Sequence, residues 1–177
     1  MISRRNFLLM ASAGCVASLS SQAFASVLPR TERSLRLYNL HTGEKLTTTY
    51  WTEGEYHHAE LTAVNYFLRD FRNDEVDRID PHLLDQLCLL QHKLKHNAAY
   101  HIISGYRSPQ TNAELRRHET GVAKHSLHMQ GRAIDLRLPG VELKHLQQAA
   151  LAMHAGGVGY YAQSNFVHLD TGRPRFW

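Results

Sequence analysis

The sequence has little cysteine and no hydrophobic run long enough for a membrane span. Its 177 residues include only Cys15 and Cys88, which excludes a small fold held together by several disulfides. The apolar stretch from Phe7 to Val16 is too short to cross a bilayer. A hydrophobic share of 43% with 20% charged residues is typical of a globular chain. We therefore expect no stable membrane anchor and a single domain over residues 26–177.

The first residues, "MISRRNFLLMASAGCVASLSSQAFAS", predict a cleaved export signal over residues 1–25. Paired arginines precede the apolar stretch, and small residues at Ala23 and Ala25 mark a cleavage site. The segment "SRRNFL" is similar to bacterial twin-arginine signals, which predicts export to the periplasm by the twin-arginine machinery. An ordinary secretory signal that begins with Arg-Arg is the alternative. Lipidation of Cys15 is not favoured, because Ser12 stands where a lipoprotein signal usually has leucine.

The charge of the chain without its leader is close to neutral. Two of the 20 basic residues, Arg4 and Arg5, lie in the leader, which leaves 18 basic against 16 acidic side chains. The sequence therefore gives no evidence for binding to nucleic acid. Cys88 lies in "LLDQLCLLQ" and is expected to be a small buried side chain on a helix. We expect a monomer without a nucleic-acid partner.

The pattern of apolar residues predicts strands near both ends of the domain and helices between them. This order, without a regular alternation of strands and helices, favours an α+β fold with helices flanking a small, mostly antiparallel sheet. The expected strands are a hairpin over 34–51 that turns at 41–43, and single strands over 99–104, 132–138, 158–161 and 165–170. The expected helices cover 58–71, 81–96, 109–117 and 141–154.

Two of the predicted strands carry polar side chains opposite an aliphatic face. In "RAIDLRL", residues two apart share a face, so Asp135 points away from the core. In "FVHLD", the same alternation puts His168 and Asp170 on one face. His128 arrives from the preceding loop, where Gly131 permits a bend that other residues resist. Two imidazoles and a carboxylate suit one zinc ion with a fourth position open for water. A chance spacing among the 13 histidines is the alternative.

Three segments of the chain resemble blocks of one enzyme family. "SLHMQGRAIDL" is similar to the S-x-H-x-x-G-x-A-x-D signature of the D-alanyl-D-alanine metallopeptidases, which include VanX-type dipeptidases and zinc D,D-carboxypeptidases. "SGYRSPQTN" and "FVHLDTG" resemble the other two blocks of the branch of YcbK-type murein endopeptidases. The resemblance implies that His128, Asp135 and His168 bind zinc. It also implies that Arg107 contacts the substrate or transition state and that Ser126 hydrogen-bonds the substrate.

The sequence departs from this family at the general base. Many relatives place that group two or three residues before the last metal ligand, where this chain has Phe166 and Asn165. Neither side chain can take a proton from water. Asp170 is our candidate for the base, because it lies two residues beyond His168 on the same strand face. A carboxylate that only orients the His168 ring, or one tied to Arg173 or to the following turn, is the alternative.

Other polar and aromatic residues surround the predicted cleft. His118 and His125 lie in loops near it, and we include His125 among the substrate-binding candidates. Tyr106, Tyr160 and Tyr161 could line the cleft, although tyrosines on strands more often serve packing.

The predicted function is a zinc-dependent murein endopeptidase that hydrolyses cross-links between peptidoglycan stem peptides. A D,D- or L,D-carboxypeptidase acting on stem peptides is one alternative. A zinc-bearing module that binds cell-wall peptides without cutting them is another, and the missing base favours it. A histidine-rich metal carrier is disfavoured because the histidines are scattered along the chain.

Overall fold

The computed structural model describes residue 28 and residues 31–118 and 121–177. The predicted leader lies outside these residues. The strands are β1 (Glu32–Asn39), β2 (Lys45–Thr52), β3 (Glu55–Tyr56), β4 (Tyr100–Ser104), β5 (Ala133–Arg137), β6 (Gly157–Tyr161), β7 (Phe166–Asp170) and β8 (Arg175–Phe176). The helices are α2 (His58–Phe67), α3 (Pro81–Leu94), α4 (Pro109–His118), α5 (Leu143–Leu151) and the short 3-10 helix η1 (Leu127–Gln130). Within the described residues, no helix has the length and apolar character to cross a membrane.

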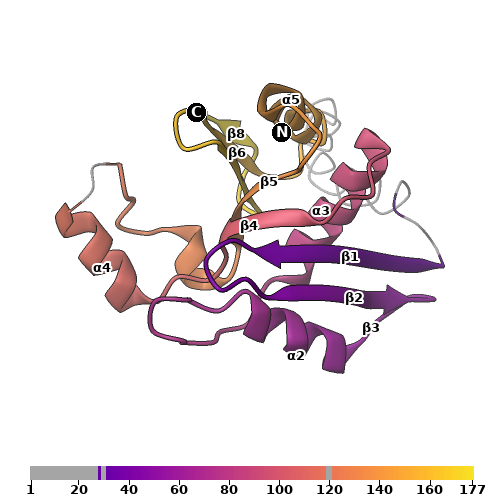
Figure 1. The fold of residues 1–177 in the computed structure, drawn as a ribbon, viewed down its shortest axis with the longest axis horizontal. Coiled ribbons are helices and arrows are strands. Elements are labelled where there is room, and N and C mark those ends of the chain that lie inside the picture. Colours follow the sequence, from indigo (N-terminus) through magenta and orange to yellow (C-terminus); the bar gives the residue numbers. More distant parts are fainter. Residues whose placement is uncertain (1–27, 29–30, 119–120) are drawn as a thin grey trace, which may run out of the picture.

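All eight strands form one mixed sheet in the order β3-β2-β1-β4-β5-β7-β6-β8 (Figure 1). The α+β class is confirmed, but the prediction of a small, mostly antiparallel sheet was wrong. Strands β1 and β4 pair in parallel, as do β6 and β8. The first of these pairings is possible because α2 and α3 provide the long crossover that parallel neighbours need. Strands β3 and β8 have two residues each, too few for a visible alternation in the sequence.

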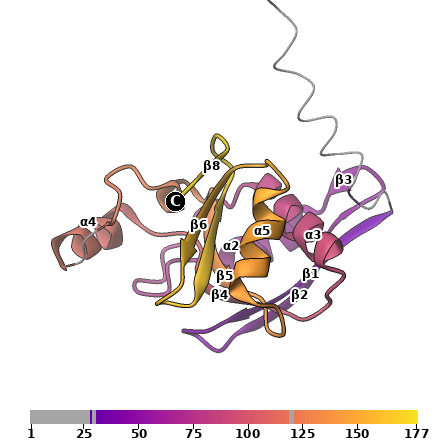
Figure 2. The same cartoon turned by 90° about the horizontal axis from the view of Figure 1, so that it is seen from above.

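Three of the helices pack on the sheet through their apolar sides. Helix α3 contacts β1, helix α5 contacts β6 and β7, and α2 contacts β2. Helix α3 begins at Pro81, where the Asp80 carboxylate accepts a hydrogen bond from the backbone N–H of His82 at 3.0 Å. Cys88 is buried on this helix, as predicted. Helix α4 projects away from the sheet at one end of the molecule in both views (Figures 1 and 2).

The aliphatic residues of three neighbouring strands, β5, β7 and β6, separate the core from the site. Ile134 and Leu136 of β5, Val167 and Leu169 of β7, and Val158 of β6 are all buried in one hydrophobic cluster. Side chains alternate along a strand, so Asp135 and His168 project from the other face of the sheet. The core thus holds the polar side chains of these strands at fixed positions.

The segment after α2 supports the loop that carries Arg107. Helix α2 ends at Phe67, earlier than the predicted residue 71, and the chain continues as an irregular loop to α3. In this loop, the carbonyl of Leu68 accepts a hydrogen bond from the backbone N–H of Tyr106 at 2.8 Å. The buried carboxylate of Asp70 accepts one from the backbone N–H of Ser108 at 2.9 Å. Both neighbours of Arg107 are therefore tied to this loop.

The same loop packs closely against Gly131, at the end of η1. Gly131 has φ +62°, and an added Cβ would lie 2.0 Å from the carbonyl oxygen of Arg78. Its own carbonyl accepts a hydrogen bond from the backbone N–H of Asp80 at 2.9 Å. Only glycine combines this backbone conformation with so close an approach.

Replacing Gly131 by alanine is therefore expected to destabilise the fold strongly. A left-handed alanine costs about 1–2 kcal/mol, and the contact with Arg78 adds to that cost. Gly43→Ala is the matched control, because Gly43 has φ +73° and no atom within 4 Å of an added Cβ. Urea denaturation is expected to show a loss of unfolding free energy for Gly131→Ala that exceeds the control by roughly 1 kcal/mol or more. Equal losses in the two variants would contradict this account of the turn.

Candidate metal centre

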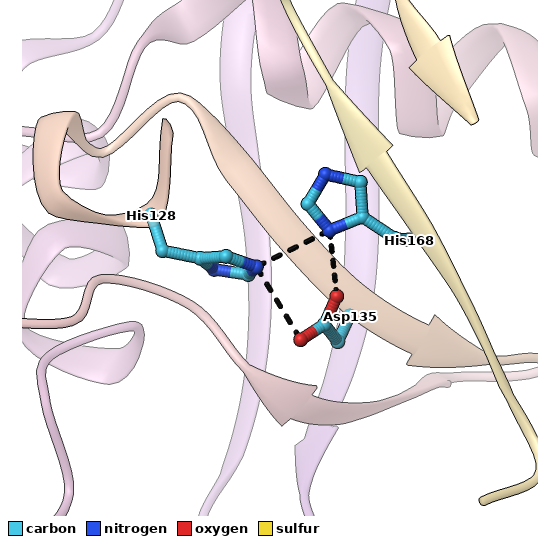
Figure 3. A group of neighbouring side chains, drawn as sticks. All are labelled: His128, Asp135 and His168. Atoms are coloured by element: carbon cyan, nitrogen blue, oxygen red, sulfur yellow. Dashed lines mark hydrogen bonds and ion pairs between the residues drawn. The ribbon is translucent and has the colours of Figure 1, made fainter. Parts of the chain in front are cut away.

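Three predicted ligands come together on one face of the sheet. His128 extends from η1, Asp135 from β5 and His168 from β7 (Figure 3). One potential ligand atom of each residue lies within 4.8 Å of the other two. The Nδ1 of His168 is 2.8 Å from Oδ1 of Asp135, and the Nε2 of His128 is 3.2 Å from that Nδ1. The Nε2 of His128 is also 3.3 Å from Oδ2 of Asp135.

The strand register and the η1 turn explain why these side chains meet. Asp135 and His168 are direct partners in the antiparallel pairing of β5 and β7, and directly paired residues share a face. His128 is placed by its turn. The hydroxyl of Ser126 accepts a hydrogen bond from the backbone N–H of His128 at 3.3 Å, and Gly131 ends the turn in a left-handed conformation.

Each imidazole has its second nitrogen hydrogen-bonded on the outer side of the cluster. His128 Nδ1 lies 2.7 Å from the carbonyl oxygen of Gly105, which can only accept, so this nitrogen donates and Nε2 faces the cluster. His168 Nε2 lies 3.1 Å from Oδ2 of Asp170. His128 Nε2 and His168 Nδ1 thereby face Asp135. Outer acceptors of this kind fix the tautomer and orientation of metal-binding histidines.

The electrostatics of the cluster favour a charged carboxylate beside the imidazoles. Burial alone would raise the pKa of Asp135, but the two histidines outweigh burial and hold this pKa well below its usual range. Burial likewise opposes the charged form of His168, yet Asp135 and Asp170 raise its pKa. A negative oxygen beside two nitrogen donors is an arrangement that attracts a cation.

The donor set fits a catalytic zinc ion. Donors bound to one tetrahedral zinc at about 2.0–2.1 Å lie roughly 3.3–3.4 Å apart. The two separations that involve His128, 3.2 and 3.3 Å, already match this spacing. The three side chains are 3%, 6% and 8% exposed in chain order, so water competes little for them. Two nitrogens and one carboxylate oxygen leave a fourth position for a reacting group, as catalytic zinc sites do.

Asp170 lies outside the ring of three donors and is fully buried. Besides His168, its carboxylate accepts hydrogen bonds from the backbone N–H groups of Gly157 and Gly172 at 3.0 and 2.8 Å. Arg175 donates to both of its oxygens, at 3.0 and 2.6 Å. Burial would raise the pKa of Asp170, but these donors outweigh it and hold the pKa well below the usual range. These contacts favour the orienting role for Asp170 over the predicted base, and its arginine partner is Arg175 rather than Arg173.

The other predicted site residues lie around the cluster with different degrees of contact. Arg107 is partly buried, and its backbone N–H donates to the carbonyl of His128 at 3.1 Å. Its guanidinium lies 3.4 Å from Oδ1 of Asn112. Ser126 caps the η1 turn, so its hydroxyl already has a structural partner. His125 is exposed on the loop that leads into this turn.

Of the predicted cleft tyrosines, Tyr106 is a packing residue. It is buried, and its hydroxyl donates to Oε1 of Glu75 at 3.0 Å. Burial, together with the Glu75 carboxylate, raises the pKa of Tyr106 to about 12. Tyr160 is half-buried and packs against the core, whereas Tyr161 is exposed.

Comparison with known proteins agrees with this geometry. A family model described as "Peptidoglycan L,D-endopeptidase MepK" matches residues 28–177. This chain belongs to that family. The peptidoglycan L,D-endopeptidase MepK of Escherichia coli (strain K12) is 47% identical over 161 residues, covering 91% of this chain and 88% of the relative. The "Probable peptidoglycan L,D-endopeptidase MepK" of Haemophilus influenzae is 39% identical over 163 residues, covering 92% and 88%.

Membership of the MepK family confirms the resemblance to YcbK-type murein endopeptidases. Sequence reasoning did not find the Gly105 carbonyl, Arg175 or Trp177, whose ring centroid lies 5.2 Å from that of His168. Residue types do not show which backbone carbonyl accepts a hydrogen bond from a side chain. Arg175 and Trp177 follow Pro174 in a stretch too short to show a strand pattern, although the paired charges of Asp170 and Arg175 were visible.

Asp170→Asn tests the orienting role. The substitution keeps the shape of the side chain but replaces a charged acceptor beside His168 by an amide. We expect zinc affinity, measured by competition with a chelator, to fall on the order of 10–100-fold. Glu55→Gln makes the same change from acid to amide at an exposed carboxylate on β3 and should leave zinc affinity unchanged. Unchanged affinity with turnover reduced by about 10²–10⁴ would instead make Asp170 the base.

Proposed function

We propose that this chain is a zinc-dependent peptidoglycan endopeptidase that hydrolyses cross-links between stem peptides at a bond between an L- and a D-centre. The observation that carries the proposal is the buried His128, Asp135 and His168 cluster in a chain of the MepK family. The L,D preference rests on the names of the relatives, which are L,D-endopeptidases. The stem peptides of the cell wall are the proposed substrate.

The three clustered side chains would hold the metal and the surrounding groups would keep them in place. When bound, zinc polarises a scissile carbonyl and lowers the pKa of the attacking water from about 16 toward roughly 7. The carbonyl of Gly105 and the carboxylate of Asp170 fix the His128 and His168 rings from outside. A rigid set of donors is needed because small displacements of catalytic groups reduce the rate strongly.

Arg107 is the proposed stabiliser of negative charge on the scissile carbonyl oxygen. The backbone N–H of Arg107 donates a hydrogen bond to the carbonyl of His128, so the guanidinium extends from a position next to the metal centre. A positive group placed where an oxyanion develops is worth on the order of 10²-fold or more in rate. Asn112, which accepts from this guanidinium, would keep the side chain oriented.

The attacking water must lose a proton, and the side chains at the position of the general base in many relatives cannot accept it here. Phe166 and Asn165 occupy that position, and Asp170 is engaged by Arg175 and two backbone N–H groups. His125, exposed on the loop before η1, remains the predicted alternative. Substrate contacts by Ser126 also stay a prediction.

The proposed place of action is the periplasm. Peptidoglycan lies outside the cytoplasm, so an enzyme that acts on it must be exported. The paired Arg4 and Arg5 favour the twin-arginine route, and cleavage after Ala25 would release the domain that matches the family model. Export by this route is a prediction from the leader alone.

Digestion of defined muropeptide dimers tests the function. The purified mature chain is expected to hold about one zinc ion and to convert cross-linked dimers into monomers, followed by mass spectrometry. Asp135→Ala should abolish both zinc binding and cleavage, because it removes the only negative donor of the cluster. Arg137→Ala, two residues along the same strand, should leave zinc content and cleavage intact.

The products of this digest separate the proposed function from its rivals. Release of a single terminal amino acid, with the dimer otherwise intact, would indicate a carboxypeptidase. Binding of the dimers without turnover by the zinc-loaded chain would indicate a non-catalytic module. Full cleavage by a chain shown by elemental analysis to be metal-free would contradict the zinc mechanism.

A further inference from the structure

The face of the sheet that carries the three clustered side chains continues toward strand β8. Gly159 of β6 is the direct partner of His168 in the pairing of β6 with β7, so both lie on this face. The indole of Trp177 covers Gly159, and an added Cβ there would lie 2.8 Å from Nε1 and Cε2 of that ring. Asp135, His168, Gly159 and Trp177 therefore follow one another across the sheet.

Trp177 is held firmly in this position. Its backbone N–H donates to Val158 and its carbonyl accepts from Tyr160, at 3.3 and 3.0 Å. The indole N–H donates to the hydroxyl of Tyr161 at 2.8 Å. The guanidinium of Arg175, bound to Asp170, lies 4.9 Å from the indole centroid. A side chain fixed by so many contacts loses little conformational entropy when a ligand binds.

This fixed indole nevertheless stays open to solvent. Trp177 is 46% exposed, whereas Trp51, the other tryptophan, is 8% exposed and belongs to the core. Tyr161 is 37% exposed and stacks on Phe166 with ring centroids 4.5 Å apart and planes 17° apart. We call Tyr161, Phe166 and Trp177 the aromatic strip.

The strip begins beside the metal centre, with Phe166 at the position where this sequence lacks a base. Phe166 stands where many relatives place the base, two residues before His168 and on the same strand face. The indole ring of Trp177 and the imidazole of His168 are neighbours, with centroids 5.2 Å apart. A substrate whose scissile bond lies at the cluster would extend over one end of the strip.

We propose that the aromatic strip binds the stem peptide on one side of the scissile bond, with Trp177 as its main contact and specificity-determining residue. This inference rests on the proposed function. The Trp177 N–H is already bonded to Tyr161, so the exposed ring offers an apolar face. Such a face binds aliphatic C–H groups of a peptide and excludes water from them. The matching part of the substrate is its methyl and methylene groups rather than a charged end.

Steady-state kinetics on bare cross-linked peptides, without sugars, test the proposal. Trp177→Ala is expected to raise KM on the order of 10-fold and to leave kcat and zinc content unchanged. The lost indole contact would stabilise the bound substrate and the transition state equally, so its removal weakens binding without slowing the chemical step. Trp177→Phe retains an aromatic face and should raise KM less. Phe176→Ala is the matched control, since Phe176 is 75% exposed on the adjacent position, and its KM should equal that of the wild type.

Several results would overturn the inference. One is an unchanged KM in both Trp177 variants, and Trp177→Phe supplies this test even if Trp177→Ala does not fold. A lower kcat and zinc content at constant KM would show that Trp177 only supports His168. A KM change seen with disaccharide-bearing muropeptides but not with bare peptides would assign the strip to the sugars. If the zinc-loaded wild type cleaves no dimer at all, the proposed function fails and this inference fails with it.

Discussion

The register between β5 and β7 is the constraint on which the site depends. It places Asp135 directly opposite His168, and a shift by one residue would turn one of the two side chains into the core. The buried aliphatic residues of both strands oppose such a shift, because it would expose them to water. Hydrophobic burial on one face therefore sets the distance between two polar groups on the other.

The third donor depends on backbone contacts rather than on the sheet. His128 is fixed by the Gly105 carbonyl at its ring and by the Arg107 N–H at its backbone. The loop after α2 supports these partners through Leu68 and Asp70, which accept hydrogen bonds from the residues on either side of Arg107. The same loop packs against Gly131, which ends the turn that carries His128. A substitution in that loop can thus alter the metal centre without touching a ligand.

Much of the site was predictable from the sequence because its chemistry follows the alternation of strands. The alternation in "RAIDLRL" and "FVHLD" predicts that Asp135, His168 and Asp170 lie on the polar faces of their strands. The glycine in "HMQGR" indicates a bend. The size and mixed pairing of the sheet could not be predicted, since β3 and β8 are two residues long and the pairing of β1 with β4 joins distant segments. The contacts of Asp170 with Arg175 could not be predicted either, because they arise only when β8 pairs with β6.

We propose that His128, Asp135 and His168 bind one zinc ion. X-ray absorption at the zinc edge of the loaded chain tests it most directly. We expect a first shell of nitrogen and oxygen at about 2.0–2.1 Å, with the scattering of two imidazoles and no sulfur at about 2.3 Å. We also expect this spectrum to disappear in Asp135→Ala. A sulfur shell, or the same spectrum in that variant, would mean that the zinc binds elsewhere and would contradict the account.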